Sequence, residues 1–185
     1  VVDVGPASWF YLRALREACP RAQIVGVEVD PYRRFRDFYR RIDHAQAQVR
    51  RWAPTARYRK DDFLSPRFQA WYARQDPAST LTTFFFPLVF AKTARQWGLP
   101  GKFTRWQDQL SRALEHSQQV LVAHADVQEL EVSQQILEGG GFRVHVTEVT
   151  IPSWSRDPVW VVSIQSPVLS SAGADFPRKG PVRQP

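Results

Sequence analysis

The sequence contains a single cysteine, Cys19, among its 185 residues. One cysteine excludes an internal disulfide and any metal site built from several cysteines, so no metal is expected. No apolar run approaches the roughly 20 residues that are needed to span a bilayer. No basic-then-apolar leader opens the chain either. These absences favour a cytoplasmic protein with no membrane partner.

The composition is not that of a disordered chain. It is 43% hydrophobic and 13% aromatic, and a chain of this length can bury a sizeable core. Residues 167–185 differ, because they contain four prolines and few apolar groups. We therefore predict one domain over residues 1–166, followed by a disordered tail over residues 167–185.

The net positive charge of the chain comes from its first third. Residues 1–60 hold 13 basic and 6 acidic residues, whereas residues 61–185 hold 12 of each. Many of these arginines fall in a helix that we predict over residues 31–51, and such a patch can attract phosphate backbones. The candidate nucleic-acid contacts are Arg33, Arg34, Arg40, Arg41, Arg50 and Arg51. A solvated helix face in an arginine-rich chain is the alternative.

Apolar runs alternate with helical periodicity along the chain, which is typical of an α/β fold. We predict strands over residues 1–4, 24–29, 56–60, 81–86, 120–124, 142–151 and 160–164. We predict helices over residues 9–19, 31–52, 66–74, 106–116 and 127–138, and an irregular segment over residues 88–103. This alternation indicates an open parallel sheet with helices on both faces. The loop 152–158 is too short for a crossover helix, so the last two strands must be antiparallel neighbours.

Turn and acidic residues follow the first three predicted strands. Gly5 opens the turn after the first strand, Glu28 closes the second, and Asp62-Phe63 follow the third. Ligands of open α/β sheets bind at the carboxyl ends of the strands. A carboxylate at the second strand can accept hydrogen bonds from both ribose hydroxyls of a nucleoside. An acidic and aromatic pair beyond it can hold the adenine amino group and cover the ring.

These features resemble the class I S-adenosylmethionine-dependent methyltransferases. The segments Val1–Gly5 and Ile24–Pro31 are similar to the strand that ends in Asp-x-Gly-x-Gly-x-Gly and to the next strand, which ends in the ribose-binding acid. The resemblance implies a three-layer Rossmann-like sandwich with a mostly parallel seven-stranded sheet, order 3-2-1-4-5-7-6, and a C-terminal antiparallel hairpin. It implies S-adenosylmethionine as the cofactor and methyl transfer as the activity. The cofactor-binding residues that it indicates are Asp3, Gly5, Pro6, Ala7, Trp9, Glu28, Val29, Asp62, Phe63 and Phe86.

The glycine motif departs from this family in two ways. Ala7 and Trp9 occupy the positions of the second and third glycines. Pro6, which lies between Gly5 and Ala7, has no amide hydrogen to give a ligand. Trp9 can line the methionine end of the pocket or fill the space of the cofactor. A catalytically inactive module that contacts nucleic acid through the helix 31–51 is therefore the alternative. A nicotinamide-binding protein would need Gly-x-Gly-x-x-Gly, of which only Gly5 is present.

The methyl acceptor is not predicted by the sequence. The family members that methylate amino groups of nucleic acids carry Asp/Asn-Pro-Pro-aromatic after the fourth strand, where this chain has Phe84-Phe85-Phe86-Pro87-Leu88. The carboxamide or carboxylate that would accept the amino hydrogens is absent, which argues against an exocyclic adenine nitrogen. His124, at the end of the strand 120–124, is the candidate base, with a hydrogen-bonded structural role as the alternative.

Overall fold

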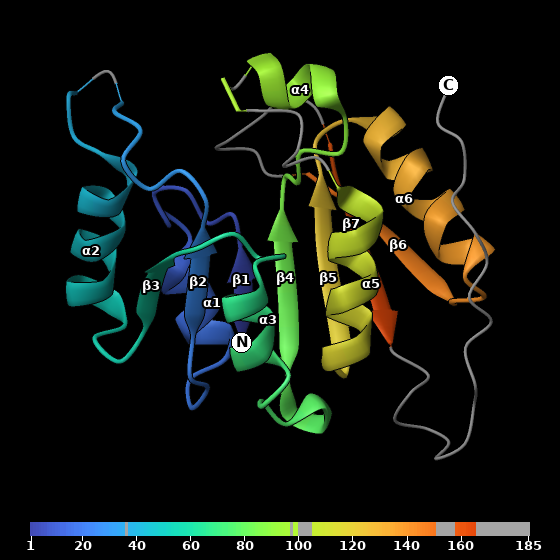
Figure 1. Cartoon of the computed structure of the whole chain (residues 1–185), viewed down its shortest axis with the longest axis horizontal. Coiled ribbons are helices and arrows are strands. Elements are labelled where there is room, and N and C mark those ends of the chain that lie inside the picture. Colours follow the sequence, from blue (N-terminus) through green and yellow to red (C-terminus); the bar gives the residue numbers. More distant parts are fainter. Residues whose placement is uncertain (36, 97, 100–104, 151–157, 166–185) are drawn as a thin grey trace.

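The computed structural model describes residues 1–35, 37–96, 98–99, 105–150 and 158–165, and they form one seven-stranded sheet with helices on both faces (Figure 1). The strands are β1 (Val2–Val4), β2 (Val25–Glu28), β3 (Arg57–Lys60), β4 (Leu81–Phe85), β5 (Gln119–His124), β6 (Val144–Val149) and β7 (Val159–Gln165). The helices are α1 (Leu12–Ala18), α2 (Arg41–Trp52), α3 (Pro66–Tyr72), α4 (Ala91–Gln96), α5 (Trp106–His116) and α6 (Val127–Gly139), with a 3-10 turn η1 (Pro77–Ser79) before β4. The tail 167–185 and residues 152–157 of the last loop lie outside the described residues.

The strand order is β3-β2-β1-β4-β5-β7-β6, which confirms the predicted topology. Strands β3, β2, β1, β4 and β5 are parallel to one another. Strand β7 pairs antiparallel with both β5 and β6, as the short last loop requires. The direction of the strand order reverses at β1, which lies between β2 and β4. The carboxyl ends of all five parallel strands lie along one edge of the sheet, at the top of Figure 1, and we call this the carboxyl edge.

Two apolar cores pack against the two faces of the sheet. Helices α3, α5 and α6 cover one face, and α1 and α2 cover the other (Figure 1). The main core lies under α3, α5 and α6 and includes Phe63, Phe68, Tyr72, Phe84, Trp106 and Leu110. The second core lies under α1 and α2 and consists of Trp9, Leu12, Leu15, Ile24, Ala45, Ala53 and Ala56. Buried strands with apolar side chains on both faces explain the continuous apolar runs of the sequence.

The predicted helix 31–51 is wrong in its first ten residues. Helix α2 begins at Arg41, and the described residues before it, 31–35 and 37–40, contain turns and an antiparallel bridge between Arg34 and Arg40. The backbone of Arg40 is extended, and its N–H donates to Asp43 Oδ2 at 2.9 Å. This bond is one half of a capping box, in which the third helical residue satisfies the amide before the helix. The aromatic spacing before Arg40 imitated a helical stripe without forming one.

The segment 88–103, which was predicted to be irregular, contains the short helix α4. Other boundaries agree with the predictions to within about three residues, apart from β6, which is shorter than its predicted range 142–151. Helix α4 lies above the carboxyl edge of the sheet (Figure 1). Among the described residues, none of the helices combines the length and apolar character that crossing a bilayer would require.

Candidate functional site

The tertiary structure brings most of the predicted site residues together at the carboxyl edge. They are Gly5, Pro6, Ala7 and Trp9 after β1, Glu28 and Val29 at the end of β2, Asp62 and Phe63 after β3, Phe86 after β4 and His124 at the end of β5. The register places Val4 beside Val27 on one side and beside Phe84 on the other. The loop after β1 therefore lies between the ends of β2 and β4, where the strand order reverses and ligands of such sheets bind.

The loop after β1 has a left-handed backbone at three positions. Gly5, Ala7 and Trp9 have φ angles of 71°, 48° and 55°, and these are the positions of the three glycines in the family motif. A positive φ is easy for glycine and strained for alanine or tryptophan. The loop thus adopts a left-handed backbone at two residues, Ala7 and Trp9, that do not favour it. A Cβ added at the exposed Gly5 would meet no atom within 4 Å, so the turn is open to a ligand there.

Contacts with buried groups hold this strained loop in place. The Ala7 N–H donates to Glu28 Oε2 at 3.0 Å, and the Trp9 Nε1–H donates to Asp3 Oδ2 at 2.7 Å. The Tyr58 hydroxyl donates to the Ala7 carbonyl oxygen at 2.7 Å. Hydrogen bonds to buried carboxylates are among the stronger ones. Together these bonds offset the strain of the two left-handed residues.

The Trp9 side chain lies inside the protein. It has no exposed surface, and its ring centroid is 5.8 Å from that of Tyr58. A Cβ added at Gly26, in the middle of β2, would lie 2.9 Å from Trp9 Cζ2. The indole therefore occupies the second core against the middle of the sheet, and the glycine at position 26 makes room for it. Sequence reasoning did not identify Gly26 as the partner of Trp9.

Asp3 organises the loop from below. Its carboxylate is completely buried and accepts hydrogen bonds from Trp9 Nε1, from the Tyr11 hydroxyl at 2.8 Å and from Thr83 Oγ1 at 2.7 Å. Burial raises the pKa of Asp3 to about 6, although the three bonds act in the opposite direction. The side chain thus ties the loop after β1 to the neighbouring strand β4.

We expect Asp3 to make stability depend on pH. Because its pKa rises from 3.8 to about 6 on folding, the native state holds this proton more tightly than the unfolded chain. Its contribution is fully present below pH 3.8 and is lost as pH rises through 6, by about 3 kcal/mol in total. Urea unfolding of the wild type and of Asp3→Asn between pH 4 and pH 7 measures this. The stability of wild type minus variant should fall across the range, and a flat difference would contradict the assignment.

Glu28 is a buried acceptor at the end of β2. It is 2% exposed, and Oε1 accepts from the Asp30 N–H at 2.8 Å and from Arg41 Nη1 at 3.2 Å, while Oε2 accepts from the Ala7 N–H. Its carboxylate therefore links the loop after β1, the residue after β2 and the start of α2. A ribose hydroxyl can reach it only by replacing one of these donors.

The prediction that Arg41 contacts nucleic acid is wrong. It is 5% exposed, and its guanidinium pairs with Glu28 at 3.2 Å. A buried arginine on a buried glutamate cannot bind a phosphate backbone. The sequence offered one signal that was missed: Arg41 lies four residues before Ala45, on the same helix face as the apolar stripe, where a cation needs a buried partner.

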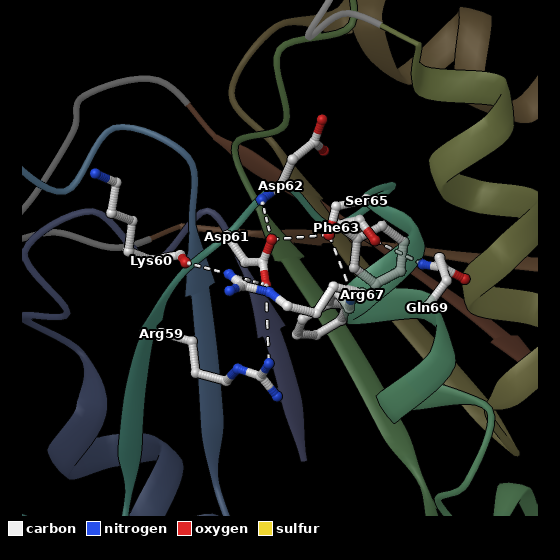
Figure 2. A network of polar contacts seen from close by, with 9 residues as sticks. Arg59, Lys60, Asp61, Asp62, Phe63, Ser65, Arg67 and Gln69 are labelled. Atoms are coloured by element: carbon white, nitrogen blue, oxygen red, sulfur yellow. Dashed lines mark hydrogen bonds and ion pairs between the residues drawn. The ribbon is translucent and has the colours of Figure 1, made fainter.

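The loop after β3 begins with two acidic residues, Asp61 and Asp62, that have different roles. Asp61 Oδ1 accepts from Ser65 Oγ at 2.8 Å, and Oδ2 accepts from Arg67 Nη2 at 2.9 Å, so Asp61 fixes the start of α3. Figure 2 shows the Asp62 carboxylate pointing away from this network. Its Oδ1 accepts from the Leu64 N–H at 2.9 Å, and the side chain is only partly buried. Asp62 is thus the acidic group that this loop leaves accessible.

The ring of Phe63 does not lie at the open edge. It is 3% exposed and packs against Phe68, Tyr72 and Phe84, with ring centroids 5.5 to 5.7 Å away. The prediction that its ring face covers an adenine is therefore corrected: the ring belongs to the main core. Aromatic side chains that follow a buried strand often extend its core, and the sequence pattern is the same in both cases.

The fold of this chain is similar to those of several solved methyltransferase structures. No protein-family model matches the sequence, and no curated protein matches it significantly. Residues amounting to 89% of the chain superpose on precorrin-6y C5,15-methyltransferase from Geobacter metallireducens GS-15 with a TM-score of 0.61 and 11% identity, covering 78% of that chain. The N-terminal domain of human METTL16 in complex with SAH gives a TM-score of 0.59 at 12% identity, and 60% of it is covered. The methyltransferase domain of bacterial CtHen1 gives 0.55 at 14% identity, with 88% covered.

The chain has the Rossmann-like fold of the class I S-adenosylmethionine-dependent methyltransferases. At these identities the likeness concerns the fold and not the substrate. Within this methyltransferase fold, the order of the sheet and the antiparallel position of β7 match the prediction made from the resemblance.

His124 occupies the end of β5 in the methyltransferase fold. It has no exposed surface, and neither ring nitrogen has a hydrogen-bond partner among the described residues. Burial lowers its pKa to about 4, so the imidazole is neutral at pH 7. Glu129 on α6 is also buried and accepts from Thr93 Oγ1 of α4 at 3.4 Å, and burial raises its pKa to about 7. The role of His124 as a base stays a prediction.

The remaining predicted arginines fall at opposite ends of α2. Arg33, Arg34 and Arg40 precede the helix, next to the carboxyl edge, whereas Arg50 and Arg51 lie in its last turn. Figure 1 shows α2 running from the carboxyl edge towards the opposite edge of the sheet. A helix of this length spans roughly 18 Å. The five arginines therefore do not form the single helical face that the sequence suggested.

Proposed function

We propose that this chain binds S-adenosylmethionine at the carboxyl edge of β1, β2 and β3 and transfers its methyl group to an acceptor. The observation that carries the proposal is the loop after β1, which has a left-handed backbone at Gly5, Ala7 and Trp9 although two of these residues do not favour it. Strain of this kind persists where the surrounding contacts enforce it, and it is common at functional sites. The similar solved structures, one of them in complex with SAH, support the same ligand.

The residues at this edge fit such a cofactor. Gly5 leaves open space where a Cβ would otherwise project. Asp62 presents a partly exposed carboxylate to the edge, as an adenine amino group would require. Glu28 lies between them at the end of β2, and a ribose hydroxyl would take the place of the Ala7 N–H on Oε2. Trp9 does not obstruct this arrangement, because its indole is in the second core.

Methyl transfer from this cofactor would need little acid–base catalysis from the protein. The bound cofactor would supply a sulfonium methyl group, which is already a strong electrophile. The protein then contributes by positioning the two reactants and by excluding water. Val29, Phe86 and the backbone of Pro6 and Ala7 are the proposed walls of the cofactor site. His124, neutral at pH 7, is the proposed group that orients the acceptor or takes its proton.

Calorimetric titration with S-adenosylhomocysteine tests the proposal. The wild type should release or absorb heat and gain thermal stability, whereas no heat and no thermal shift would overturn the proposal. Such a result would instead favour the non-catalytic module. Ligand binding to the native state alone must stabilise it.

Asp62→Asn should weaken this binding by about 10-fold or more, because the one amide oxygen stays with the Leu64 N–H and the NH2 group faces the adenine amino group as a second donor. The variant keeps an oxygen for the Leu64 N–H, so the fold should be unaffected. Asp76→Asn is the matched control: its carboxylate likewise accepts from the N–H two residues on, but it lies before β4 at the opposite edge. Equal affinities of the two variants would mean that Asp62 does not contact the cofactor.

A further inference from the structure

The segment between β2 and α2 concentrates exposed aromatic side chains. Tyr32, Phe38 and Tyr39 are 51%, 80% and 62% exposed. They are three of the five large hydrophobic side chains that are exposed among the described residues. Single exposed apolar residues are normal, whereas apolar side chains that gather on a surface mark interaction sites.

Two cations lie close to one of these rings, that of Tyr32. Lys60 Nζ is 4.4 Å from the centre of the Tyr32 ring, and the Arg40 guanidinium is 5.7 Å from it. The exposed Arg34 pairs with Arg40 across the antiparallel bridge. We call this set the aromatic–basic surface; it consists of Tyr32, Arg34, Phe38, Tyr39, Arg40 and Lys60.

Acidic groups next to the aromatic–basic surface are already paired. The Asp43 carboxylate accepts hydrogen bonds from the backbone N–H and the guanidinium of Arg40. Asp37 Oδ2 lies 3.0 Å from His44 Nε2. The positive charge of Arg34 and Lys60 has no such carboxylate within 4.0 Å among the described residues. The aromatic–basic surface therefore combines apolar rings with cations available to an anion.

Phe38 is strained as well as exposed. Its φ is 67°, in the left-handed region that a bulky side chain rarely adopts. Bonds from the Phe38 N–H to the Phe35 carbonyl and from the Phe35 N–H to the Tyr39 carbonyl hold the turn. Packing within the chain does not offset the strain, because the ring is 80% exposed. The turn therefore holds the Phe38 ring out in solvent.

The aromatic–basic surface adjoins the carboxyl edge. Lys60 is the last residue of β3, and Tyr32 follows the end of β2 by four residues. Arg33 reaches the segment after α4, since a Cβ at Gly98 would lie 2.6 Å from Arg33 Nη2. Figure 1 shows the chain before α2 projecting above the sheet on the same edge as α4. A molecule held on this surface is thus beside the proposed cofactor site.

We propose that the aromatic–basic surface binds single-stranded nucleic acid, with bases stacked on Phe38 and Tyr39 and phosphates held by Arg34 and Lys60. Alternating rings and cations match the alternation of bases and phosphates in a single strand. A duplex hides its base faces, and an anionic membrane or acidic protein would use the cations without stacking on the rings. That the bound strand is the methyl acceptor rests on the proposed function, whereas binding itself does not.

Fluorescence anisotropy with labelled single-stranded oligonucleotides of about 15 residues tests the surface without any cofactor. RNA and DNA of mixed sequence are compared with an abasic strand of the same length. We expect affinity to fall steeply with salt, because counterions are released from phosphates. We also expect the abasic strand to bind at least about 10-fold more weakly, because it has no bases to stack. The RNA and DNA arms show which of the two sugars is preferred.

Variants separate stacking from charge. Phe38→Ala combined with Tyr39→Ala should lower affinity for the base-containing strands by about 10- to 100-fold and leave the abasic strand unaffected. Phe38→Tyr keeps a ring and should bind as the wild type does. Arg34→Gln should weaken all strands and reduce the salt dependence, whereas Arg50→Gln, at the far end of α2, should change neither.

Three outcomes would overturn the proposal. They are equal affinity for the abasic and base-containing strands, equal effects of Arg34→Gln and Arg50→Gln, and binding to vesicles of anionic lipid but not to oligonucleotides. The calorimetric titration on the same preparations keeps the two proposals distinct. Oligonucleotide binding without S-adenosylhomocysteine binding would retain the surface and reject the methyltransferase, and the converse result would do the opposite.

Discussion

Replacing Arg41 with methionine is expected to lower the free energy of unfolding by about 3 to 5 kcal/mol. Arg41 and Glu28 are 5% and 2% exposed, and they form an ion pair at 3.2 Å. Methionine has a similar length but no charge, so the Glu28 carboxylate would remain buried with only the N–H groups of Ala7 and Asp30 as donors. An uncompensated buried charge accounts for the expected loss.

Arg112→Met is the control for this prediction, measured by urea unfolding in parallel. Arg112 pairs with Glu115 at 2.6 Å, but both side chains are about half exposed. Exposed pairs contribute about 1 kcal/mol or less, so the control should be nearly neutral. Similar small effects of both variants would mean that the two amides suffice for Glu28. In that case Arg41 would not hold the carboxylate in its place at the carboxyl edge.

Trp9→Ala is expected to lower the free energy of unfolding by about 3 to 5 kcal/mol, which is typical of removing a large buried aromatic side chain. The variant empties part of the second core and removes a donor from the Asp3 carboxylate. It also removes the contact that holds a left-handed backbone in the loop after β1. We therefore expect weaker binding of S-adenosylhomocysteine in the fraction that remains folded.

Gly26→Ala tests the placement of Trp9 by the opposite change. Its Cβ would lie 2.9 Å from Trp9 Cζ2 and 3.0 Å from Pro6 Cγ, and overpacking of this kind costs about 1 to 3 kcal/mol. Phenylalanine at position 9 lacks the outer ring of the indole, so Trp9→Phe should relieve part of this clash. The double variant should lose less stability than the sum of the two single variants. Strict additivity would place the indole elsewhere.

The fold was predictable because its signals are local and periodic. The continuous apolar runs at β2, β4 and β5 are typical of parallel strands with both faces covered, and the short last loop allowed only an antiparallel pair. Helix α2 shows the limit of such patterns. Its predicted first ten residues have helical aromatic spacing, but the helix begins later, where the Arg40 N–H donates to the Asp43 carboxylate.

The sequence by itself determined the order of the strands and which residues follow their ends at the carboxyl edge. It did so because the local sequence pattern sets where each strand ends, and parallel strands place their carboxyl ends along one edge of the sheet. Only the tertiary structure decided what each of these side chains does there. Trp9 and Phe63 turn into the two cores, Asp3 ties the loop to β4, and Arg41 is buried on Glu28. The direction, burial and partners of a side chain depend on contacts between residues far apart in sequence, such as Glu28 and Ala7 or Trp9 and Gly26. A local sequence pattern does not contain such contacts.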